Sequence, residues 1–195
     1  MALVPWVRPA FGRLLAITAV LAISACGGGS PTEAVAADVP AADGPCGLLK
    51  LAEVRQALPE VQKAERDRSV DQHGIFTCAW RTGTGGRALI VQRWDGSDSA
   101  DVEIRGQMIG MVDPLKPQAG KSLRYETISG VGDEARAVVE RRDDARGILS
   151  DFGCLFAKLG DHGLSLCSQD IAKLERPQAL KALQDLARAA AGRME

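Results

Sequence analysis

Residues 154–167 read Cys-Leu-Phe-Ala-Lys-Leu-Gly-Asp-His-Gly-Leu-Ser-Leu-Cys, and this stretch decides the fold. Two apolar runs flank Gly160-Asp161, a dipeptide typical of a tight turn between antiparallel strands. With the turn centred there, Cys154 lies opposite Cys167, while Leu155 pairs with Leu166 and Ala157 with Leu164 on the other face. The stretch therefore predicts a hairpin whose two strands are joined by a disulfide.

The chain contains five cysteines, and their use bears on the compartment in which it works. If Cys26 is modified, as argued below, the hairpin pair leaves Cys46 to bond with Cys78. Metal binding and redox exchange lack the required spacing, because the sequence has no C-x-x-C and no paired histidines. Two structural disulfides are therefore expected, and they predict an oxidising, extracytoplasmic compartment.

Residues 46–195 are expected to form one domain. Apolar spacing predicts helices over 48–58, 98–111 and 177–190. Outside the hairpin, strands are predicted over 75–81, 88–95, 123–128, 135–140 and 147–152. The predicted fold class is α+β, with about three helices packed on a mostly antiparallel sheet and two disulfides.

A weak internal similarity leaves one question open. The pattern Phe76-x-Cys78-x-Trp80 recurs as Phe152-x-Cys154-x-Phe156, each time before a Gly-containing turn and an apolar strand. This is either a repeat of two β-β-α units or a chance likeness between two hairpins.

Residues 1–25 have the layout of a secretory signal. Arg8 and Arg13 precede an apolar core over residues 14–23, which is too short to span a bilayer of about 30 Å. The following Leu21-Ala22-Ile23-Ser24-Ala25-Cys26 resembles a bacterial lipobox. This resemblance implies a lipoprotein signal peptide over 1–25 and a diacylglyceryl group with further fatty acyl on Cys26, the only cofactor expected.

The lipid is expected to hold the protein on a membrane, because two or more acyl chains give stable anchoring. Gly27 follows the cysteine, where Asp favours retention at an inner membrane in such lipoproteins. Outer-membrane sorting is therefore favoured if the cell has two membranes. Residues 26–45 are small, polar or proline-rich and are expected to form the lipidated cysteine and a flexible tether.

Charge and aromatic content argue against nucleic acid as a partner. The chain has 24 basic and 25 acidic residues, and removing residues 1–45 leaves 22 of each. A neutral domain has no overall field to attract a polyanion. Six aromatic residues remain beyond the leader, too few to predict a platform on which bases stack.

Three short motifs resemble a known type of protein. They are Cys46-Gly47-Leu48-Leu49-Lys50-x-x-Glu53-Val54, then Cys78-Ala79-Trp80, and then Gly130-Val131-Gly132-Asp133-Glu134-Ala135. Together they resemble small bacterial lipoprotein and extracytoplasmic domains of unknown function, some of which are sensor parts of membrane kinases. Lys50 departs from the Thr or Ser of that pattern, and the hairpin cysteines are additional. The resemblance implies fold and location and no defined chemistry.

Several short motifs with charged or glycine residues have a simpler structural explanation than a binding site. Residues 130–135 fit G-x-G-x-x-A, but a strand follows where a dinucleotide site needs a helix, so we interpret them as a turn. Asp95, Asp98 and Asp101 could meet a Ca²⁺ ion but are explained by a turn and a helix cap. His73 and His162 are expected in solvated loops. The remaining candidate is a charged hairpin tip that could dock a partner, comprising Arg141, Arg142, Asp143, Asp144 and Arg146.

The leading hypothesis is a non-enzymatic, membrane-anchored lipoprotein of the cell envelope. It would be a binding, sensing or assembly-accessory module that meets an envelope protein or a small ligand. Two alternatives remain open: an envelope hydrolase with a site built from His73 or His162 and nearby acids, and a purely structural interface protein.

Overall fold

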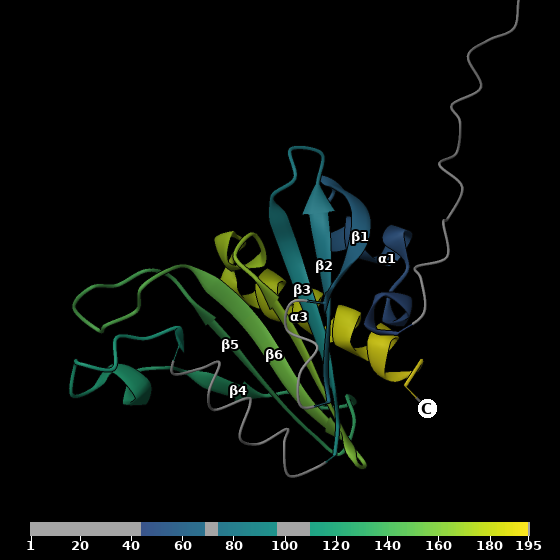
Figure 1. Cartoon of the computed structure of the whole chain (residues 1–195). Coiled ribbons are helices and arrows are strands. Elements are labelled where there is room, and N and C mark those ends of the chain that lie inside the picture. The colour runs from purple at the N-terminus through teal and green to yellow at the C-terminus, as the bar shows by residue number, and fades with distance from the viewer. Residues whose placement is uncertain (1–43, 69–73, 97–109, 195) are drawn as a thin grey trace, which may run out of the picture. The chain divides into compact units, whose positions relative to one another are not determined.

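A seven-stranded antiparallel sheet organises the domain (Figure 1). The computed structural model describes residues 44–68, 74–96 and 110–194. The strands are β1 (Val61–Asp67), β2 (Ile75–Thr82), β3 (Arg87–Asp95), β4 (Tyr125–Thr127), β5 (Glu134–Glu140), β6 (Phe152–Leu159) and β7 (His162–Ser168). They lie in the order β1-β2-β3-β7-β6-β5-β4, so two meanders meet where β3 pairs with β7.

The hairpin at residues 154–167 has the register that its sequence predicts. Cys154 pairs with Cys167, Leu155 with Leu166 and Ala157 with Leu164. Gly160 has φ +57°, a conformation that glycine adopts readily in a tight turn.

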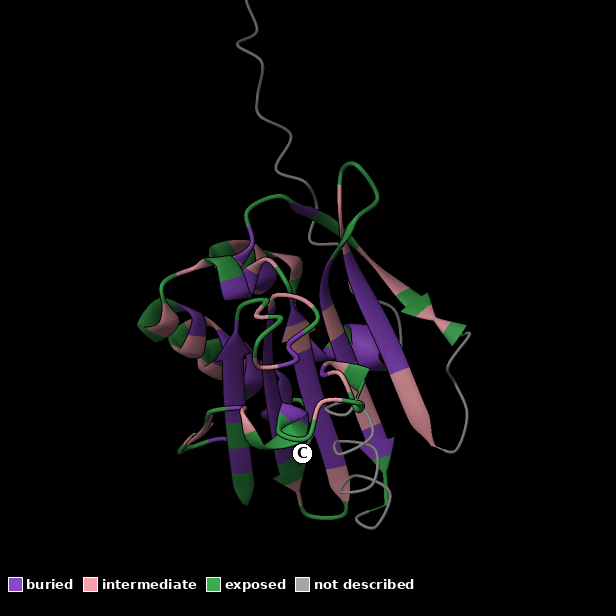
Figure 2. Ribbon diagram, turned by 90° about the vertical axis from the view of Figure 1, so that its left-hand side faces the viewer, coloured by how far each residue is buried: buried purple, intermediate pink, exposed green. Residues whose placement is uncertain are grey.

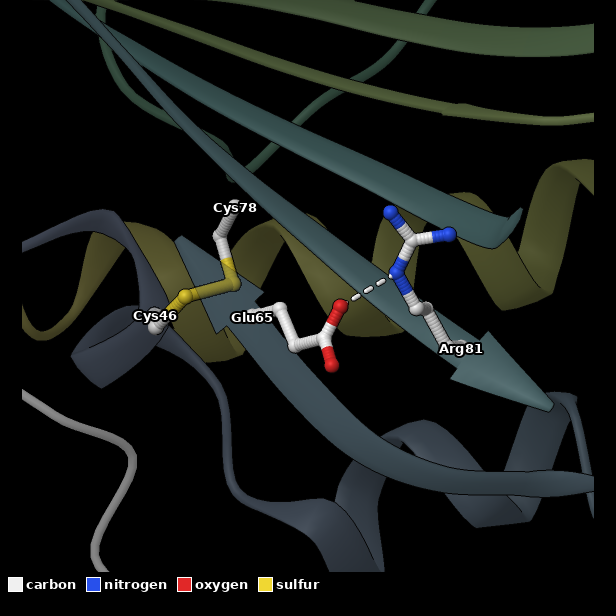
Figure 3. Close-up of a disulfide and its surroundings, with 4 residues drawn as sticks. All are labelled: Cys46, Glu65, Cys78 and Arg81. Atoms are coloured by element: carbon white, nitrogen blue, oxygen red, sulfur yellow. Dashed lines mark hydrogen bonds and ion pairs between the residues drawn. A yellow bond between two sulfur atoms is a disulfide. The ribbon is translucent and has the colours of Figure 1, made fainter. Parts of the chain in front are cut away.

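Two disulfides are present, as expected. They join Cys154 to Cys167 and Cys46 to Cys78. The second bond links the short 3-10 helix η1 (Pro45–Leu48) to β2, beside the Glu65–Arg81 ion pair (Figure 3). Disulfides persist in oxidising surroundings, so the two bonds indicate an extracytoplasmic compartment.

One face of the sheet packs against the helices α1 (Leu51–Ala57) and α3 (Arg176–Ala191). Residues opposite one another across the strands share this face, as in the row Cys78, Val91, Leu166, Leu155 and Ala137. All five are buried, together with Leu183 and Ala187 of α3. The strands are buried along much of their length and exposed toward several of their ends (Figure 2).

The other face carries a second, smaller core. Val138, Phe152, Cys154 and Phe156 point to this side and are buried. The residues that cover them come from the connections between strands and are Val112, Ala119, Leu123 and Ile148. The domain therefore has a helical layer on one face and a loop layer over part of the other.

The helix content is lower than predicted. The described residues contain two α-helices and three short 3-10 helices, η1, η3 (Ala119–Lys121) and η4 (Ile171–Lys173), so the expectation of about three packed helices was wrong for this part of the chain. The helix expected over 98–111 falls almost entirely outside the described residues. The domain is mostly sheet, and the α+β prediction holds only in outline. None of the described helices is long and apolar enough to cross a bilayer.

Two strand predictions were wrong. The sequence predicts no strand before residue 75, yet β1 occupies Val61–Asp67 at the sheet edge, where charged side chains hide the alternation of a half-buried strand. Residues 147–152 do not form a strand of their own, since Ile148 makes only isolated bridges to Val112 and Asp143.

The internal similarity is not a symmetric repeat. Cys78 lies in the row that faces the helices. Cys154 pairs with Cys167, which lies opposite Ile90, and Ile90 lies opposite Ala79, the neighbour of Cys78. Successive residues of a strand point to opposite faces, so the two cysteines do too. A two-fold axis perpendicular to the sheet would place equivalent residues on the same face. Cys78 and Cys154 lie on opposite faces, so such an axis does not relate the two motifs.

Candidate functional site

A groove of about 440 Å³ lies between α1 and α3 on the helical side of the domain. Its apolar lining consists of Ala57, Leu174, Ala182, Leu186 and Ala189. Its polar lining consists of Glu53, Gln56, Gln178, Lys181 and Asp185. An apolar floor with a few polar groups around it is the composition of many sites for small ligands or peptide side chains.

One ion pair and two hydrogen bonds to the backbone fix the walls of this groove. Arg193, beyond the end of α3, donates to Glu53 of α1 at 2.5 and 3.0 Å and to the carbonyl oxygen of Leu48 at 2.9 Å. Glu53 also accepts the backbone N–H of Lys50 at 2.8 Å. Burial alone would raise the pKa of Glu53, but Arg193 and the Lys50 N–H hold it below its ordinary value. The charge of Glu53 is therefore engaged in holding the two helices together.

The groove can bind by both apolar and polar contacts. Lys181 and Asp185 pair with each other at 2.6 Å along one turn of α3, so the rim has no net charge from them. Gln56 and Gln178 are exposed amides that can donate and accept hydrogen bonds. These features fit a ligand or peptide of mixed polarity better than a strongly charged one.

The predicted partner loop connects β5 to β6, and its charges are largely paired within it. Arg142 lies 3.2 Å from Asp144, and Arg146 lies 2.7 Å from Asp143. Arg141 donates to the carbonyl oxygen of Lys173 at 3.2 Å, next to Leu174 of the groove. The loop therefore lies at the surface with four of its five charged side chains paired within it, while Arg141 binds a backbone carbonyl.

Glu140, a buried residue at the end of β5, holds this loop through an ion pair with Arg146. Its side chain is 1% exposed, and it accepts from Arg146 at 2.7 Å and from the backbone N–H of Arg124 at 3.1 Å. Burial would raise the pKa of Glu140, but these donors more than offset it, and the pKa lies below its ordinary value. These donors account for the burial of the Glu140 carboxylate, whose role is to hold the loop in place.

Tyr125 of β4 lies close to the same carboxylate. Its hydroxyl is buried and has no hydrogen-bond partner among the described residues. Burial, with a contribution from the charge of Glu140, raises the pKa of Tyr125 to about 12. A phenol with so high a pKa stays neutral at physiological pH.

The Gly130-Val131-Gly132-Asp133 segment is a structural turn. Strand β5 follows it, so the helix required for dinucleotide binding is missing there. The Asp133 carboxylate accepts the Gly160 N–H at 2.7 Å and thereby joins this turn to the turn between β6 and β7. Arg188 of α3 donates to the carbonyl oxygens of Ser129 and Gly130 at 3.1 and 3.3 Å.

The other candidate residues do not gather into a catalytic cluster in the described part of the chain. His73, Asp98 and Asp101 lie outside the described residues. His162 Nδ1 lies 3.1 Å from Asp95 Oδ1, where the central strands β3 and β7 end and begin, but without hydrogen-bond alignment. Among residues 44–68, 74–96 and 110–194, no three His, Cys, Asp or Glu side chains are close enough to hold a metal ion.

Comparison with known proteins gave no relative. The chain matches no family model, no curated protein sequence and no solved structure.

The groove is the feature that sequence reasoning missed. Ala182 and Ala189 lie beside the buried stripe of α3 and not within it. The sequence feature that could have indicated the groove is the small size of these two alanines on an otherwise polar face. Alanine leaves space between two helices where a larger side chain would fill it. No pattern within either helix indicates which second helix forms the other wall.

Proposed function

We propose that this chain is a lipid-anchored protein of the cell envelope whose domain binds a small ligand or a partner protein. The α1–α3 groove carries this proposal, because it combines an apolar floor with amide and charged groups at its rim. The domain would act as a binding, sensing or assembly-accessory module and would not catalyse a reaction.

Anchoring through Cys26 is the second part of the proposal. It is supported by the lipobox-like sequence before Cys26 and by the disulfides, which fit an exported protein. Replacing Cys26 with Ser should move the protein from the membrane to the soluble fraction. Mass spectrometry of the intact mature protein should show acyl chains on Cys26, and an unmodified residue 26 would refute the anchor.

The binding role is tested by cross-linking from defined positions. A photo-reactive benzophenone residue replaces Gln178 at the groove rim, Arg142 in the partner loop or Thr84 in the turn between β2 and β3. We expect a specific adduct from Gln178, with Thr84 as the control. An adduct from Arg142 alone would move the site to the loop, and equal labelling from all three positions would argue against a defined site.

A groove-filling variant tests the same site by function. Ala182→Trp places a large side chain in the groove, whereas Ala52→Trp makes the same change at an exposed position of α1 that does not line it. In the deletion strain, Ala182→Trp should fail to restore the phenotype and Ala52→Trp should restore it. Full complementation by Ala182→Trp would exclude the groove as the working surface.

A hydrolase is the second candidate, and the observation in its favour is the 3.1 Å approach of His162 Nδ1 to Asp95 Oδ1. A hydrogen bond between the two side chains, once aligned, would make them one component of a general-base site. Replacing His73 and His162 together distinguishes the two functions. Complementation by the double variant would exclude histidine-dependent hydrolysis, and its loss would favour the enzyme over the binding module.

A further inference from the structure

We infer that the loop layer over the second core binds the surface of an anionic membrane and inserts a leucine between the lipid headgroups. Two segments make up this part of the layer, residues 110–124 and 141–151. They are joined where the N–H of Asp113 donates to the carbonyl oxygen of Gly147 at 2.7 Å. Both segments lie largely at the left of Figure 1, away from α1.

The exposed apolar side chains of the domain lie in this layer. Leu115 is 90% exposed and Leu149 is 52% exposed, and in the described part of the chain these are the large apolar residues that face solvent. Single leucines scattered over a surface are ordinary. Here the two belong to adjoining segments that cover the same core, and neither contributes its exposed surface to folding. Their exposure therefore points to a surface that is covered on binding.

The turn that carries Leu115 is held in shape before anything binds. The N–H of Lys116 donates to the carbonyl oxygen of Asp113 at 3.2 Å, which closes a four-residue turn with Pro114 at its second position. The Asp113 carboxylate accepts the N–H of Leu115 at 2.9 Å. Proline fixes the backbone φ at its position. The leucine is therefore presented on an ordered turn, which lowers the entropy lost when it inserts.

The charge around this leucine is positive and partly unpaired. The two segments contain six basic and four acidic residues, although residues 46–195 as a whole are neutral. Asp143 and Asp144 are paired with arginines of their own loop. Lys116 and Lys121 have no ion pair within the described ranges, and the side-chain carbons of Lys116 lie against Gly147. Two ammonium groups beside Leu115 are therefore available to anionic headgroups.

This combination fits a lipid surface better than a protein partner. A stable protein interface buries about 800 Å² on each partner around a continuous apolar centre. Leucines among free lysines instead match the boundary of a bilayer, where apolar side chains enter the acyl region and ammonium groups stay with the phosphates. The helices α1 and α3 pack on the opposite face of the sheet, so the groove between them stays open when the loop layer meets a membrane. The inference depends neither on that groove nor on the acyl anchor.

An environment-sensitive label tests the contact by position. The full chain with Cys26→Ser has no acyl anchor and no odd cysteine, so Gln118→Cys or the control Thr84→Cys is the only free thiol and takes nitrobenzoxadiazole. Both positions are exposed, Gln118 near Leu115 and Thr84 in the turn between β2 and β3. Vesicles of phosphatidylethanolamine and phosphatidylglycerol at about 5 mM lipid should raise the emission at least about threefold at residue 118 and leave residue 84 unchanged. Vesicles of neutral phosphatidylcholine should give a much smaller rise.

Substitutions in the labelled Gln118→Cys chain separate the leucine from the lysines. Leu115→Ser should lower the lipid affinity at least about tenfold and Leu115→Met should keep it. Lys121→Glu should lower it at least about fivefold, whereas Lys63→Glu makes the same charge change on β1 and should not. Equal emission changes at residues 118 and 84, equal changes on neutral and anionic vesicles, or an unchanged affinity in Leu115→Ser would overturn the inference. So would a change at residue 118 that requires an added envelope protein and no lipid, since it would assign the surface to a protein partner.

Discussion

At the scale of single residues, Tyr125 offers a direct reading of the second core. It is the only tyrosine in the chain, so the phenolate absorbance near 295 nm reports this residue alone. Its pKa of about 12 arises mainly from burial, with a contribution from the charge of Glu140. We expect the native titration to have a midpoint well above that of the chain unfolded in guanidinium, which should titrate near about 10.

The sign of this effect fixes its influence on stability. A raised pKa in the folded state favours the neutral phenol, so the contribution of Tyr125 is present below about pH 10 and is lost as the pH rises toward 12. Circular dichroism recorded in parallel separates simple titration from alkaline unfolding. A native midpoint equal to that of the unfolded chain would mean that the hydroxyl is solvated.

Gly132 is the residue least tolerant of a side chain in the turn before β5. Its φ is +56°, and an added Cβ would collide with the carbonyl oxygen of Lys158. Gly160 has almost the same φ, +57°, but open space around it. Gly132→Ala should therefore destabilise the domain by about 3 kcal/mol or more, and Gly160→Ala by about 1 kcal/mol.

Urea unfolding of these two variants checks the comparison. Gly132 and Gly160 have nearly the same φ, so replacing either with alanine carries the same intrinsic backbone cost. The difference in free energy of unfolding between the two variants therefore measures the clash with Lys158. Equal losses of stability would show that the turn shifts to make room and that its close contact with β6 is unimportant.

Glu140 predicts how the second core responds to acid. Its pKa is lowered because Arg146 and the Arg124 N–H outweigh the effect of burial. As the pH falls, Glu140 takes up a proton in the unfolded chain before it does so in the folded domain. The stabilisation from the Glu140 carboxylate is therefore complete above its ordinary pKa of 4.5 and is lost as the pH falls below that value. Glu140→Gln should cost about 2 kcal/mol at pH 7, and this difference should shrink toward pH 3. Denaturant unfolding at both pH values measures it, and a difference that does not depend on pH would contradict an ionic role.

At the scale of elements, α3 does more than cover the sheet. Along one side it donates from Arg176, Gln184 and Arg188 to groups in and next to β4, and at its end Arg193 holds α1. The helix thus closes one sheet edge and forms a wall of the groove. These roles depend on long polar side chains that a helical apolar stripe does not reveal.

The elements also show where sequence reasoning works. The hairpin at 154–167 was predictable in register because a turn and an alternating pattern agree. Strand β1 was missed because Lys63, Glu65 and Arg66 give it the composition of a loop. The groove could not be predicted, since residues of α1 and α3 more than 100 positions apart line it together.

At the scale of the whole molecule, the two disulfides stabilise different parts of the domain. Cys46–Cys78 joins residues separated by 32 positions and holds the start of the domain on β2, whereas Cys154–Cys167 spans 13 positions within one hairpin. A larger closed loop restricts the unfolded chain more. The chain-entropy relation gives about 4 kcal/mol for the first bond and about 3 kcal/mol for the second.

This difference yields a ranked prediction for the folded domain. In the full chain with Cys26→Ser, the pair Cys46→Ala and Cys78→Ala should lower the free energy of unfolding more than the pair Cys154→Ala and Cys167→Ala does. Domains of this size are stable by only about 5–15 kcal/mol, so losing both bonds should leave a marginal fold. Urea unfolding of each paired variant and of the quadruple variant measures the ranking. A larger loss from the hairpin pair would show that local packing around Met111 and Phe156 governs the effect, and not chain entropy.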